Sequence, residues 1–402
     1  MEEAPLMIYN DFHGDRLSRL GFGCMRFAGD PATGGLNQQL VNDMFRTAIE
    51  GGVNYFDTAY VYNGGKSETT MAEALKPYPR ESYFLADKFP GHSMPGPVDN
   101  FALFDISLQR CNTGYFDYYL LHNVNESTVK VYESEEYHIL PDVLKIKEQG
   151  KIRHLGFSYH GGTELLEEYL TRHEGVFEFV QIQCNYLDWT LQSAKEKYEI
   201  IQRHGLDVWV MEPLRGGKLA NLPAAQAEKL AALQPGASCA SFGMRFLQDL
   251  PGIKMILSGM NALPQVEDNL ATFAEHKPLG ESEREALFAV AEALKSSVPC
   301  TGCRYCCAGC PLELNIPLFL EIYNNYKFDM SAPASQDIRI FGLPEDKLPS
   351  ACVQCGQCSG ACPQKIDVPA VLAELSDMMV KSPRWADMVK ARAADIQKDL
   401  QR

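Results

Sequence analysis

Two matching runs of cysteines near the C-terminus constrain the fold of this 402-residue chain more than any other feature. Each run reads Cys-x2-Cys-x2-Cys-x3-Cys-Pro, and every cysteine of the second run lies 52 positions after its counterpart in the first. Three cysteines spaced in this way can wrap one tight turn around a cubane of iron and sulfide, and the fourth thiolate comes from the last cysteine of the opposite run. The eight cysteines are Cys300, Cys303, Cys306 and Cys310 in the first run and Cys352, Cys355, Cys358 and Cys362 in the second.

The spacing is the one that bacterial ferredoxins use to hold two 4Fe–4S clusters. Structural zinc is the alternative, because zinc also takes paired Cys-x2-Cys ligands. Zinc leaves the third cysteine of each run and the duplication unexplained, so we predict two clusters and regard Cys307 as a bystander. We expect Cys300, Cys303, Cys306 and Cys362 to hold the first cluster and Cys310, Cys352, Cys355 and Cys358 to hold the second.

The 52-residue repeat continues beyond the cysteines. Asn315 and Asp367 occupy equivalent positions, and each can cap a helix that has Pro in its first turn. Apolar helical segments follow at Leu318–Tyr323 and Ala370–Met378, and a terminal helix is expected over Met388–Gln401. We therefore expect a mainly α-helical, ferredoxin-like dicluster domain.

The first 280 residues alternate short apolar runs with longer amphipathic segments. Strands that alternate with helices predict parallel βαβ units, and eight such units fit a (β/α)₈ TIM barrel. A doubly wound sheet is the competitor, but its early Gly-rich phosphate loop is missing. We expect the barrel over residues 1–280, with a hairpin within Leu6–Leu20 at its floor, and the cluster domain over residues 281–402, beginning with a helix over Glu281–Ser297. The eight predicted strands are Leu20–Gly23, Tyr55–Thr58, Phe84–Lys88, Tyr118–His122, His154–Ser158, Phe179–Gln183, Val208–Glu212 and Lys254–Ser258.

Composition narrows the partners and the compartment. A net charge of −15 argues against nucleic acid and against anionic membrane surfaces. No stretch approaches the roughly 20 apolar residues of a membrane span, and the N-terminus has no pattern of a signal peptide. Thirteen cysteines in a large chain of this kind indicate reduced thiols and metal ligation, so we expect a cytoplasmic protein.

Polar side chains gather at the ends of the predicted strands, where barrels build their active sites. Asp57 ends the second strand, Tyr62 follows it, Lys88 ends the third strand and His122 ends the fourth. Each residue alone has an ordinary structural explanation as a cap, a loop contact or a strand-end polar group. Four proton-handling groups on one rim together indicate a catalytic site.

The segment from Gly52 to Glu68 is very similar to the signature of the aldo-keto reductases: Gly-Val-Asn-Tyr-Phe-Asp-Thr-Ala-Tyr-x-Tyr-x2-Gly-x-Ser-Glu. The likeness extends over nearly all of residues 17–275, and the whole chain resembles the subgroup with a C-terminal ferredoxin-type extension. The resemblance implies that Tyr62 exchanges the proton of a carbonyl or alcohol substrate. Lys88 would lower the pKa of Tyr62, Asp57 would hold Lys88 and His122 would orient the carbonyl.

The resemblance also implies NADPH or NADH bound in an extended pose without a Rossmann loop. Three departures from the family pattern are Tyr159 in place of Asn, Met211 in place of an aromatic residue, and Gln265 in place of a basic residue. Arg215 and Lys218 could still supply charge, so the choice between NADH and NADPH stays open. The positions that resemble cofactor contacts are Gly23, Met25, Ser158, Gln181, Pro213, Leu214, Gly216, Ser258, Gly259, Met260, Gln265, Asp268 and Asn269.

Three functions are compatible with these features. The first is an NAD(P)H-dependent reductase of an aldehyde or ketone, with structural or redox-linked clusters. The second is an electron-transfer oxidoreductase that couples the clusters to the barrel site or to a ferredoxin or flavoprotein partner. The third is a redox-sensing subunit on a retained barrel, which the complete set of four catalytic residues argues against. Because hydride carries two electrons together and a cluster passes one, we favour the first.

Overall fold

The computed structural model describes residues 7–31, 33–94, 96–294, 298, 300, 302–328, 343–380 and 385–401. The chain forms two compact units. One consists of Met1–Phe288 together with Arg392–Arg402, and the other of Ala289–Ala391. The predicted domain limits, 1–280 and 281–402, stay a prediction.

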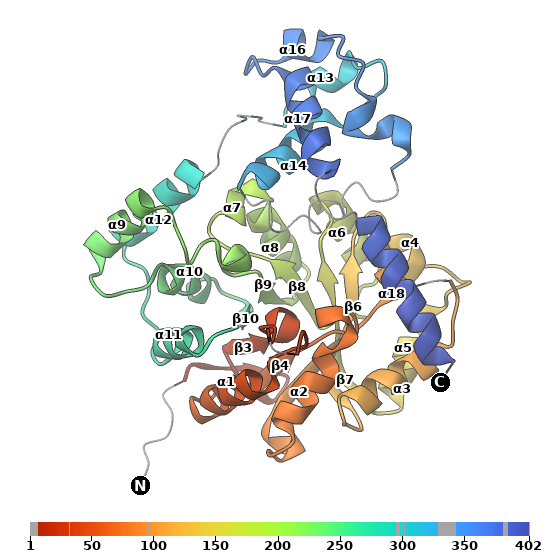
Figure 1. Cartoon of the computed structure of the whole chain (residues 1–402), viewed down its shortest axis with the longest axis vertical. Coiled ribbons are helices and arrows are strands. Elements are labelled where there is room, and N and C mark those ends of the chain that lie inside the picture. The colour runs from red at the N-terminus through yellow and green to blue at the C-terminus, as the bar shows by residue number, and fades with distance from the viewer. Residues whose placement is uncertain are drawn as a thin grey trace. The chain divides into compact units, whose positions relative to one another are not determined.

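Eight parallel strands close into a barrel in the order β10-β3-β4-β5-β6-β7-β8-β9, which confirms the predicted fold (Figure 1). Each predicted strand overlaps an observed one, although Thr58 and Glu212 lie just outside their strands. The strands are β3 (Leu20–Gly23), β4 (Tyr55–Asp57), β5 (Phe84–Phe89), β6 (Phe116–Val124), β7 (Ile152–Tyr159), β8 (Phe179–Gln183), β9 (Asp207–Met211) and β10 (Ile253–Ser258).

Helices surround this barrel, and α1 (Gln38–Glu50) shows how they form. Asn37 accepts a hydrogen bond from the Leu40 amide at 3.1 Å and so caps the helix. Val41, Phe45 and Ala48 are fully buried at helical spacing. The other helices of the ring are α2 (Ser67–Leu75), α3 (Asn100–Arg110), α5 (Ile139–Glu148), α6 (Thr163–Arg172), α8 (Ala194–Arg203), α10 (Cys239–Gln248) and α11 (Leu263–Phe273). Shorter or later helices are α4 (Val129–Tyr132), α7 (Asp188–Leu191), α9 (Ala224–Leu233) and α12 (Glu281–Leu294), and residues 295–297 of the predicted helix lie outside the described part of the chain.

Alternation along the strands positions the polar groups of the rim. Tyr55 packs in the barrel interior, and Asp57 lies two residues further on, so it faces the same side. Ala86 and Lys88 repeat this relationship on the next strand. The same parity holds for Leu120 and His122 and for Phe179 and Gln181. The apolar interior of the barrel is therefore followed, at the ends of the strands, by polar groups that face the same side.

The barrel floor is closed by the hairpin of β1 (Tyr9–Phe12) and β2 (Asp15–Ser18), as the sequence predicts. His13 and Gly14, with φ of 49° and 95°, form its two-residue turn, and such turns need positive φ at both positions. Phe12 and Leu17 pack into the interior core of the barrel.

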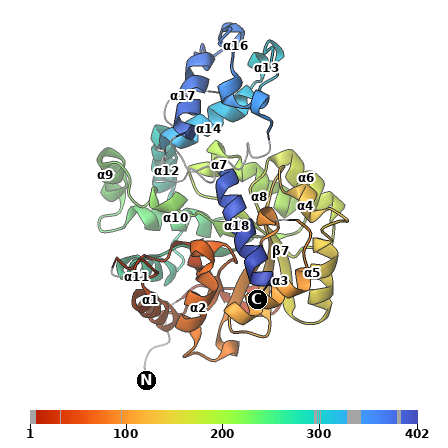
Figure 2. The same cartoon turned by 45° about the vertical axis from the view of Figure 1, so that its right-hand side comes forward.

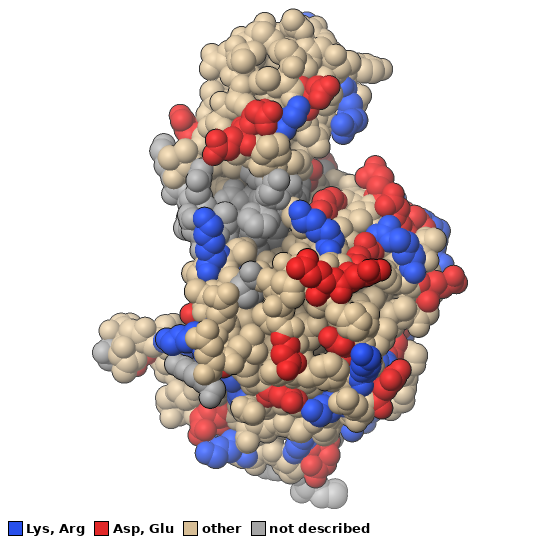
Figure 3. Space-filling model, turned by 90° about the vertical axis from the view of Figure 1, so that its right-hand side faces the viewer, with Lys and Arg blue, Asp and Glu red and all other residues tan. Residues whose placement is uncertain are grey.

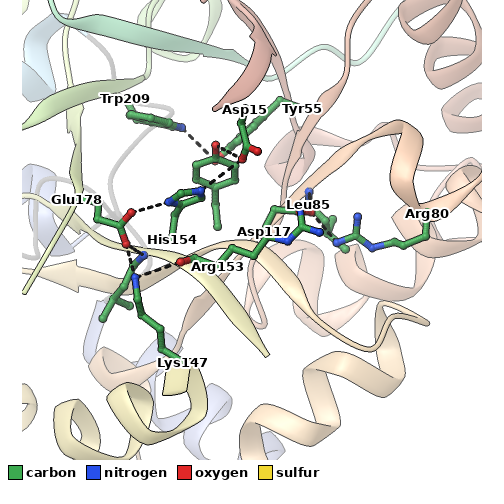
Figure 4. A network of polar contacts seen from close by, with 12 residues as sticks. Asp15, Tyr55, Arg80, Leu85, Asp117, Lys147, Arg153, His154, Glu178 and Trp209 are labelled. Carbon is green, nitrogen blue, oxygen red and sulfur yellow. Dashed lines mark hydrogen bonds and ion pairs between the residues drawn. The ribbon is translucent and has the colours of Figure 1, made fainter. Parts of the chain in front are cut away.

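A polar network crosses the same floor (Figure 4). Asp15 accepts a hydrogen bond from Tyr118 at 2.9 Å and lies 3.4 Å from His154. His154 in turn lies 2.5 Å from Glu178, which also contacts Lys147. Burial raises the pKa of Glu178, but the hydrogen bonds from His154 and Lys147 outweigh it and lower that pKa to about 2.

The second unit is helical, and the repeat in its sequence is also a repeat in its structure. The short helices α13 (Tyr305–Ala308) and α16 (Gln357–Ala361) begin 52 residues apart, as do α14 (Ile316–Phe328) and α17 (Val368–Val380). The helices α14 and α17 pack against each other around one apolar core. The predicted apolar helices at 318–323 and 370–378 are therefore confirmed, and each is longer at both ends than predicted.

The surface and the helices fit the composition. Figure 3 shows Lys and Arg side chains interspersed with Asp and Glu side chains over one face of the barrel unit. In the part of the chain that the structure describes, no helix combines the length and the apolar character that crossing a membrane requires.

Candidate active site and candidate metal centres

Lys88 and Asp57 form a buried ion pair at the C-terminal rim of the barrel. Nζ of Lys88 lies 2.5 Å from Oδ1 of Asp57 and donates a second hydrogen bond to the carbonyl of Thr58 at 2.7 Å. Lys88 is fully buried and Asp57 is 3% exposed. Burial by itself lowers the pKa of Lys88, but Asp57 and Tyr62 raise it overall, so Lys88 stays an ammonium.

Tyr62 and His122 complete the set of four. Nζ of Lys88 lies 4.8 Å from the centroid of the Tyr62 ring. The rings of Tyr62 and His122 are 5.5 Å apart and nearly perpendicular, at 85°. The structure thus brings all four predicted catalytic residues together, from β4 and the loop after it, β5 and β6.

The loop that carries Tyr62 is held by its own polar contacts. Asn63, with φ of 52°, adopts the left-handed conformation that Asn tolerates better than most residues. Its side chain donates to the carbonyl of Cys24 at 2.7 Å, and Ser67 donates to the same carbonyl at 2.8 Å. These bonds fix Tyr62 above the strand ends.

The protonation of Tyr62 differs from the sequence-based expectation. Burial raises the pKa of Tyr62 above its usual 10, and the opposing effect of Lys88 is smaller. Lys88 acts in the expected direction, but the phenol as a whole is harder to ionise than in water. Tyr62 is therefore a neutral phenol at pH 7, the form that can donate a proton.

His122 is a neutral imidazole. Burial lowers its pKa well below 6.5, and His92 and Lys88 lower it further. Among the residues that the structure describes, none hydrogen-bonds to its buried Nδ1 atom. His92, whose ring lies 4.5 Å away, comes from the turn after β5 and was not singled out by the sequence.

Ser158 and Gln181, two of the predicted cofactor contacts, are buried at strand ends beside these four. Gln181 donates to Oδ2 of Asp57 at 3.4 Å, so it borders the ion pair directly. Ser158 accepts a hydrogen bond from the Asn123 amide at 2.7 Å. Both side chains are 1% exposed.

The predicted cofactor positions at the end of β10 and in α11 hydrogen-bond to neighbouring residues of the chain. Asn269 donates to the Ser258 hydroxyl at 2.9 Å, and both residues are buried. Asp268 accepts from Ser238 at 2.7 Å, and exposed Gln265 accepts from the Asn261 amide at 2.8 Å.

Other differences from the predicted cofactor site lie around the rim of the barrel. Arg215, which could have supplied charge to a cofactor phosphate, is instead buried, 3.3 Å from Asp188. Tyr159 is buried and donates to the carbonyl of Gly162 at 2.6 Å. Of the remaining predicted cofactor positions, Met25 is half exposed, Gly216 and Gly259 are exposed, Gly23 and Leu214 are half-buried, and Pro213 and Met260 are buried.

An ion pair that the sequence analysis missed lies beside two of the predicted cofactor loops. Arg26 contacts Glu212 at 2.7 Å, and the amide of Gly216 also donates to Glu212. A Cβ atom at Gly216 or Gly259 would come within 3.3 Å of Arg26, so the arginine lies close to both loops. A guanidinium at this point suits a dinucleotide phosphate, provided that Glu212 releases it. Arg26 directly follows the predicted Met25 and lies three residues after Gly23, which is the one signal that could have found it.

In the helical unit, the eight predicted ligands line two hollows. Cys310, Cys352, Cys355 and Cys358 line one hollow. Cys300, Cys303, Cys306 and Cys362 line another. Each set combines cysteines from both runs in the predicted manner, and Cys307 lines neither hollow.

The spacing of the sulfur atoms bears on which metal group fits. Within the described residues, no three of these sulfurs lie within 4.8 Å of one another. A single zinc ion with Zn–S bonds of about 2.3 Å would draw its sulfurs closer than that. The donor set and the hollows therefore fit a cluster better than zinc.

The backbone around each cysteine run is also duplicated. Arg304 and Gly356 have φ of 63° and 74°, and they are 52 residues apart. Glu313 and Lys365, equally separated, have φ of 52° and 53°. Left-handed backbone at matching positions, three of these four not glycine, indicates that both runs adopt one wrapped conformation.

Comparison with known families agrees with this architecture. The profile described as the aldo/keto reductase family matches residues 19–292, and that of a 4Fe-4S dicluster domain matches residues 299–366. The chain belongs to the aldo/keto reductase family of oxidoreductases, and its C-terminal part carries the dicluster domain.

Individual relatives are distant. A probable aldo-keto reductase 1 of Glycine max is 27% identical over 215 residues, covering 51% of this chain and 58% of that protein. An NADH-specific methylglyoxal reductase of Escherichia coli (strain K12) is 29% identical over 221 residues, covering 50% of this chain and 65% of that protein. The chain thus spans less than two thirds of the length of these curated relatives.

A solved structure shares the fold. The aldo/keto reductase of Klebsiella pneumoniae in complex with NADP and acetate has a TM-score of 0.56 and 22% identity, covering 69% of this chain and 92% of that one.

Proposed function

We propose that this protein reduces an aldehyde or ketone to an alcohol with a nicotinamide cofactor, reversibly, and that Tyr62 is the general acid and base. The observation that carries the proposal is the convergence of Tyr62, Lys88 and His122 on one rim, with Asp57 2.5 Å from Lys88.

Carbonyl reduction adds a hydride to carbon and a proton to oxygen. The neutral Tyr62 donates its phenolic proton to the carbonyl oxygen, and the phenolate that remains is stabilised by the Lys88 ammonium. Asp57 keeps Lys88 charged and in place. His122, neutral and buried, donates a hydrogen bond to the carbonyl oxygen and orients it. In the reverse direction the phenolate takes the proton of the alcohol.

The hydride is supplied by NADH or NADPH when the cofactor is bound. Gln181 and Ser158, buried beside the ion pair, are the residues that we assign to its carboxamide. Arg26 is assigned to its phosphates, together with the loop of Pro213, Leu214 and Gly216. The relatives include one described as NADH-specific and one in complex with NADP, so both cofactors are tested below.

We assign one 4Fe–4S cluster to each of the two hollows of the helical unit. This assignment is compatible with either a structural or a redox-linked role for the clusters. The alternative function, electron transfer to a ferredoxin or flavoprotein, is included in the test below. A cluster accepts single electrons, whereas the nicotinamide gives a pair, so we favour reduction in the barrel without cluster turnover.

The test is anaerobic mixing of the full-length, cluster-loaded protein with NADH or NADPH, first alone and then with a panel of aliphatic, aromatic and carboxylated aldehydes. We expect substrate-dependent oxidation of the nicotinamide without bleaching of the cluster absorbance. Bleaching without an aldehyde would favour the electron-transfer alternative. Failure of every aldehyde to support oxidation of either nicotinamide would refute the reductase.

A further inference from the structure

The imidazole of His122 is oriented by packing within the described part of the chain. A catalytic histidine is normally oriented by the hydrogen bond that its second ring nitrogen makes. The Nδ1 atom of His122 is buried, and no described residue forms a hydrogen bond with it. The contacts that His122 makes with neighbouring rings therefore decide which way its other nitrogen, Nε2, points.

His92 makes the closer of the two ring contacts that His122 has among the described residues. The centroids of the two imidazoles lie 4.5 Å apart and the ring planes are inclined at 73°, which is an edge-to-face arrangement. The Tyr62 ring lies further from His122, at 5.5 Å. His92 is 6% exposed and His122 is 7% exposed. Because buried side chains pack densely, His92 restricts the rotation of the His122 ring.

The turn Gly91–Ser93, which carries His92, is held close to the end of β6. A Cβ atom at Gly91 would overlap the ring of Tyr132, so glycine allows the turn to approach this ring. Tyr132 in turn donates a hydrogen bond to the carbonyl of His122 at 2.5 Å. It ends α4, a short helix that packs against both β6 and the turn. Figures 1 and 2 show α4 on the outside of the barrel, beside α6.

The surroundings of His122 keep its ring neutral. Burial lowers the pKa of His122 well below 6.5, and His92 and Lys88 lower it further. Burial also lowers the pKa of His92 to about 3, so both imidazoles are uncharged at pH 7. The titratable and charged groups that contact or act on His122 are Tyr62, Lys88, His92, His160 and Arg392 of α18 (Trp385–Leu400).

A neutral imidazole carries one proton, and its position decides what His122 can do. A nitrogen that bears hydrogen needs an acceptor when it is buried, and no described residue offers one to Nδ1 of His122. The proton therefore resides on Nε2. In this form Nε2 can donate a hydrogen bond to a carbonyl oxygen, provided that the ring is held in the matching orientation.

We propose that His92 is a positioning residue, whose ring holds the His122 imidazole in the orientation in which Nε2 donates to the substrate carbonyl. The inference rests on the proposed reductase function. His92 acts through His122 and needs no contact with the substrate. A misplacement of a reacting group by about 1 Å can reduce a rate about 10²-fold, so a packing contact of this kind is sufficient to control turnover.

The first test measures kcat and KM of the full-length, cluster-loaded enzyme with one aldehyde. His92→Ala removes the ring and should lower kcat/KM about 10- to 100-fold, mostly through kcat, because the donor to the transition state loses its orientation. His92→Phe keeps a ring that can pack edge-to-face and should restore most of the lost kcat. The control His276→Ala removes an exposed imidazole and should behave as the wild type.

Two kinetic results would overturn the inference. Wild-type kinetics of His92→Ala would show that His122 needs no support from this ring. Equal losses in His92→Ala and His92→Phe would show that the ring contact is not what His92 contributes.

A spectroscopic measurement tests the positioning apart from turnover. Long-range proton–nitrogen NMR spectra of protein with ¹⁵N-labelled histidines and oxidised clusters report the tautomer and charge of each imidazole, and His122→Gln identifies the signals of His122. The wild type should show one neutral Nε2–H tautomer of His122 down to about pH 5.5, and His92→Phe should keep it. In His92→Ala both tautomers should appear, and the pKa of His122 should rise toward about 6.5 as water reaches Nδ1.

The spectra also separate this inference from the proposed function. An unchanged His122 spectrum in His92→Ala would refute the positioning role, whatever the activity. If no aldehyde is reduced but the spectrum of His122 depends on His92 as described, the reductase proposal fails and the positioning contact stands.

Discussion

The carboxylate of Asp399 lies 2.5 Å from the guanidinium of Arg110, 289 residues earlier in the chain. Arg110 also contacts the fully buried Glu68 at 3.0 Å, and Tyr60 donates to Asp399. The end of the chain is thereby attached to the helices that follow two adjacent barrel strands.

This relationship predicts that Asp399→Ala weakens the attachment of α18. Loss of hydrogen bonds to a partly buried charge should lower the free energy of unfolding of the barrel unit by about 1–2 kcal/mol. Arg110 keeps Glu68 as its partner, so the barrel itself should fold normally. Chemical denaturation measures the loss, and Asp395→Ala, at an exposed position of the same helix, is the matched control. Equal stabilities of the two variants would show that the contact contributes nothing.

Glu178 should contribute to stability in a pH-dependent way. Its pKa in the folded protein is lowered to about 2 from an ordinary 4.5, so its contribution is present above pH 4.5 and is lost as the pH falls toward 2. Glu178→Gln should therefore lower the free energy of unfolding by about 2 kcal/mol at pH 7, and by progressively less below pH 4.5. Urea denaturation at a series of pH values measures this, with the exposed Glu174→Gln as control. A difference from wild type that does not change with pH would contradict the assignment.

The pH dependence of catalysis should reflect a neutral tyrosine and a neutral histidine. Burial keeps Tyr62 protonated beyond its usual pKa of 10 and keeps His122 unprotonated well below 6.5. Reduction should therefore stay nearly constant between about pH 6 and pH 9, whereas alcohol oxidation, which needs the phenolate, should rise with pH. Steady-state kcat/KM profiles in both directions test this. An inflection in the reduction profile near the ordinary histidine pKa of about 6.5 would show that His122 titrates.

The two hollows predict which cysteines hold iron. Wild-type protein reconstituted without oxygen should bind about eight iron and eight sulfide atoms. Cys362→Ser, a change in the hollow that also contains Cys300, should lose up to about half of them, whereas Cys307→Ser should retain all. Chemical analysis of iron and sulfide decides between these outcomes. A folded, iron-free protein loaded with zinc would overturn the cluster assignment.

Much of the barrel could be predicted because its signals are local. Each strand is a short apolar run, and the period of two along it puts Asp57 above Tyr55 and Lys88 above Ala86. The internal repeat likewise placed equivalent helices and cysteines in the second unit.

The contacts that were missed depend on how loops and distant segments fold back. Arg26 and Glu212 lie in different loops, 186 residues apart. The sequence pattern of neither segment predicts that they pair. Arg215 shows the converse, since its position suggested a cofactor contact but its side chain turns inward to Asp188. The final helix was expected, but its attachment to the barrel through Asp399 has no local signal at all.

The central claim is that Tyr62 donates the proton in a barrel active site, and Tyr62→Phe tests it most directly. The variant keeps the ring beside Lys88 and His122 and removes only the hydroxyl. Carbonyl reduction by the full-length, cluster-loaded enzyme should fall about 10²- to 10⁴-fold, while the cluster absorbance and the folded structure stay as in the wild type. If the Tyr62→Phe variant reduces the same aldehyde with the same nicotinamide at the wild-type rate, the account is contradicted.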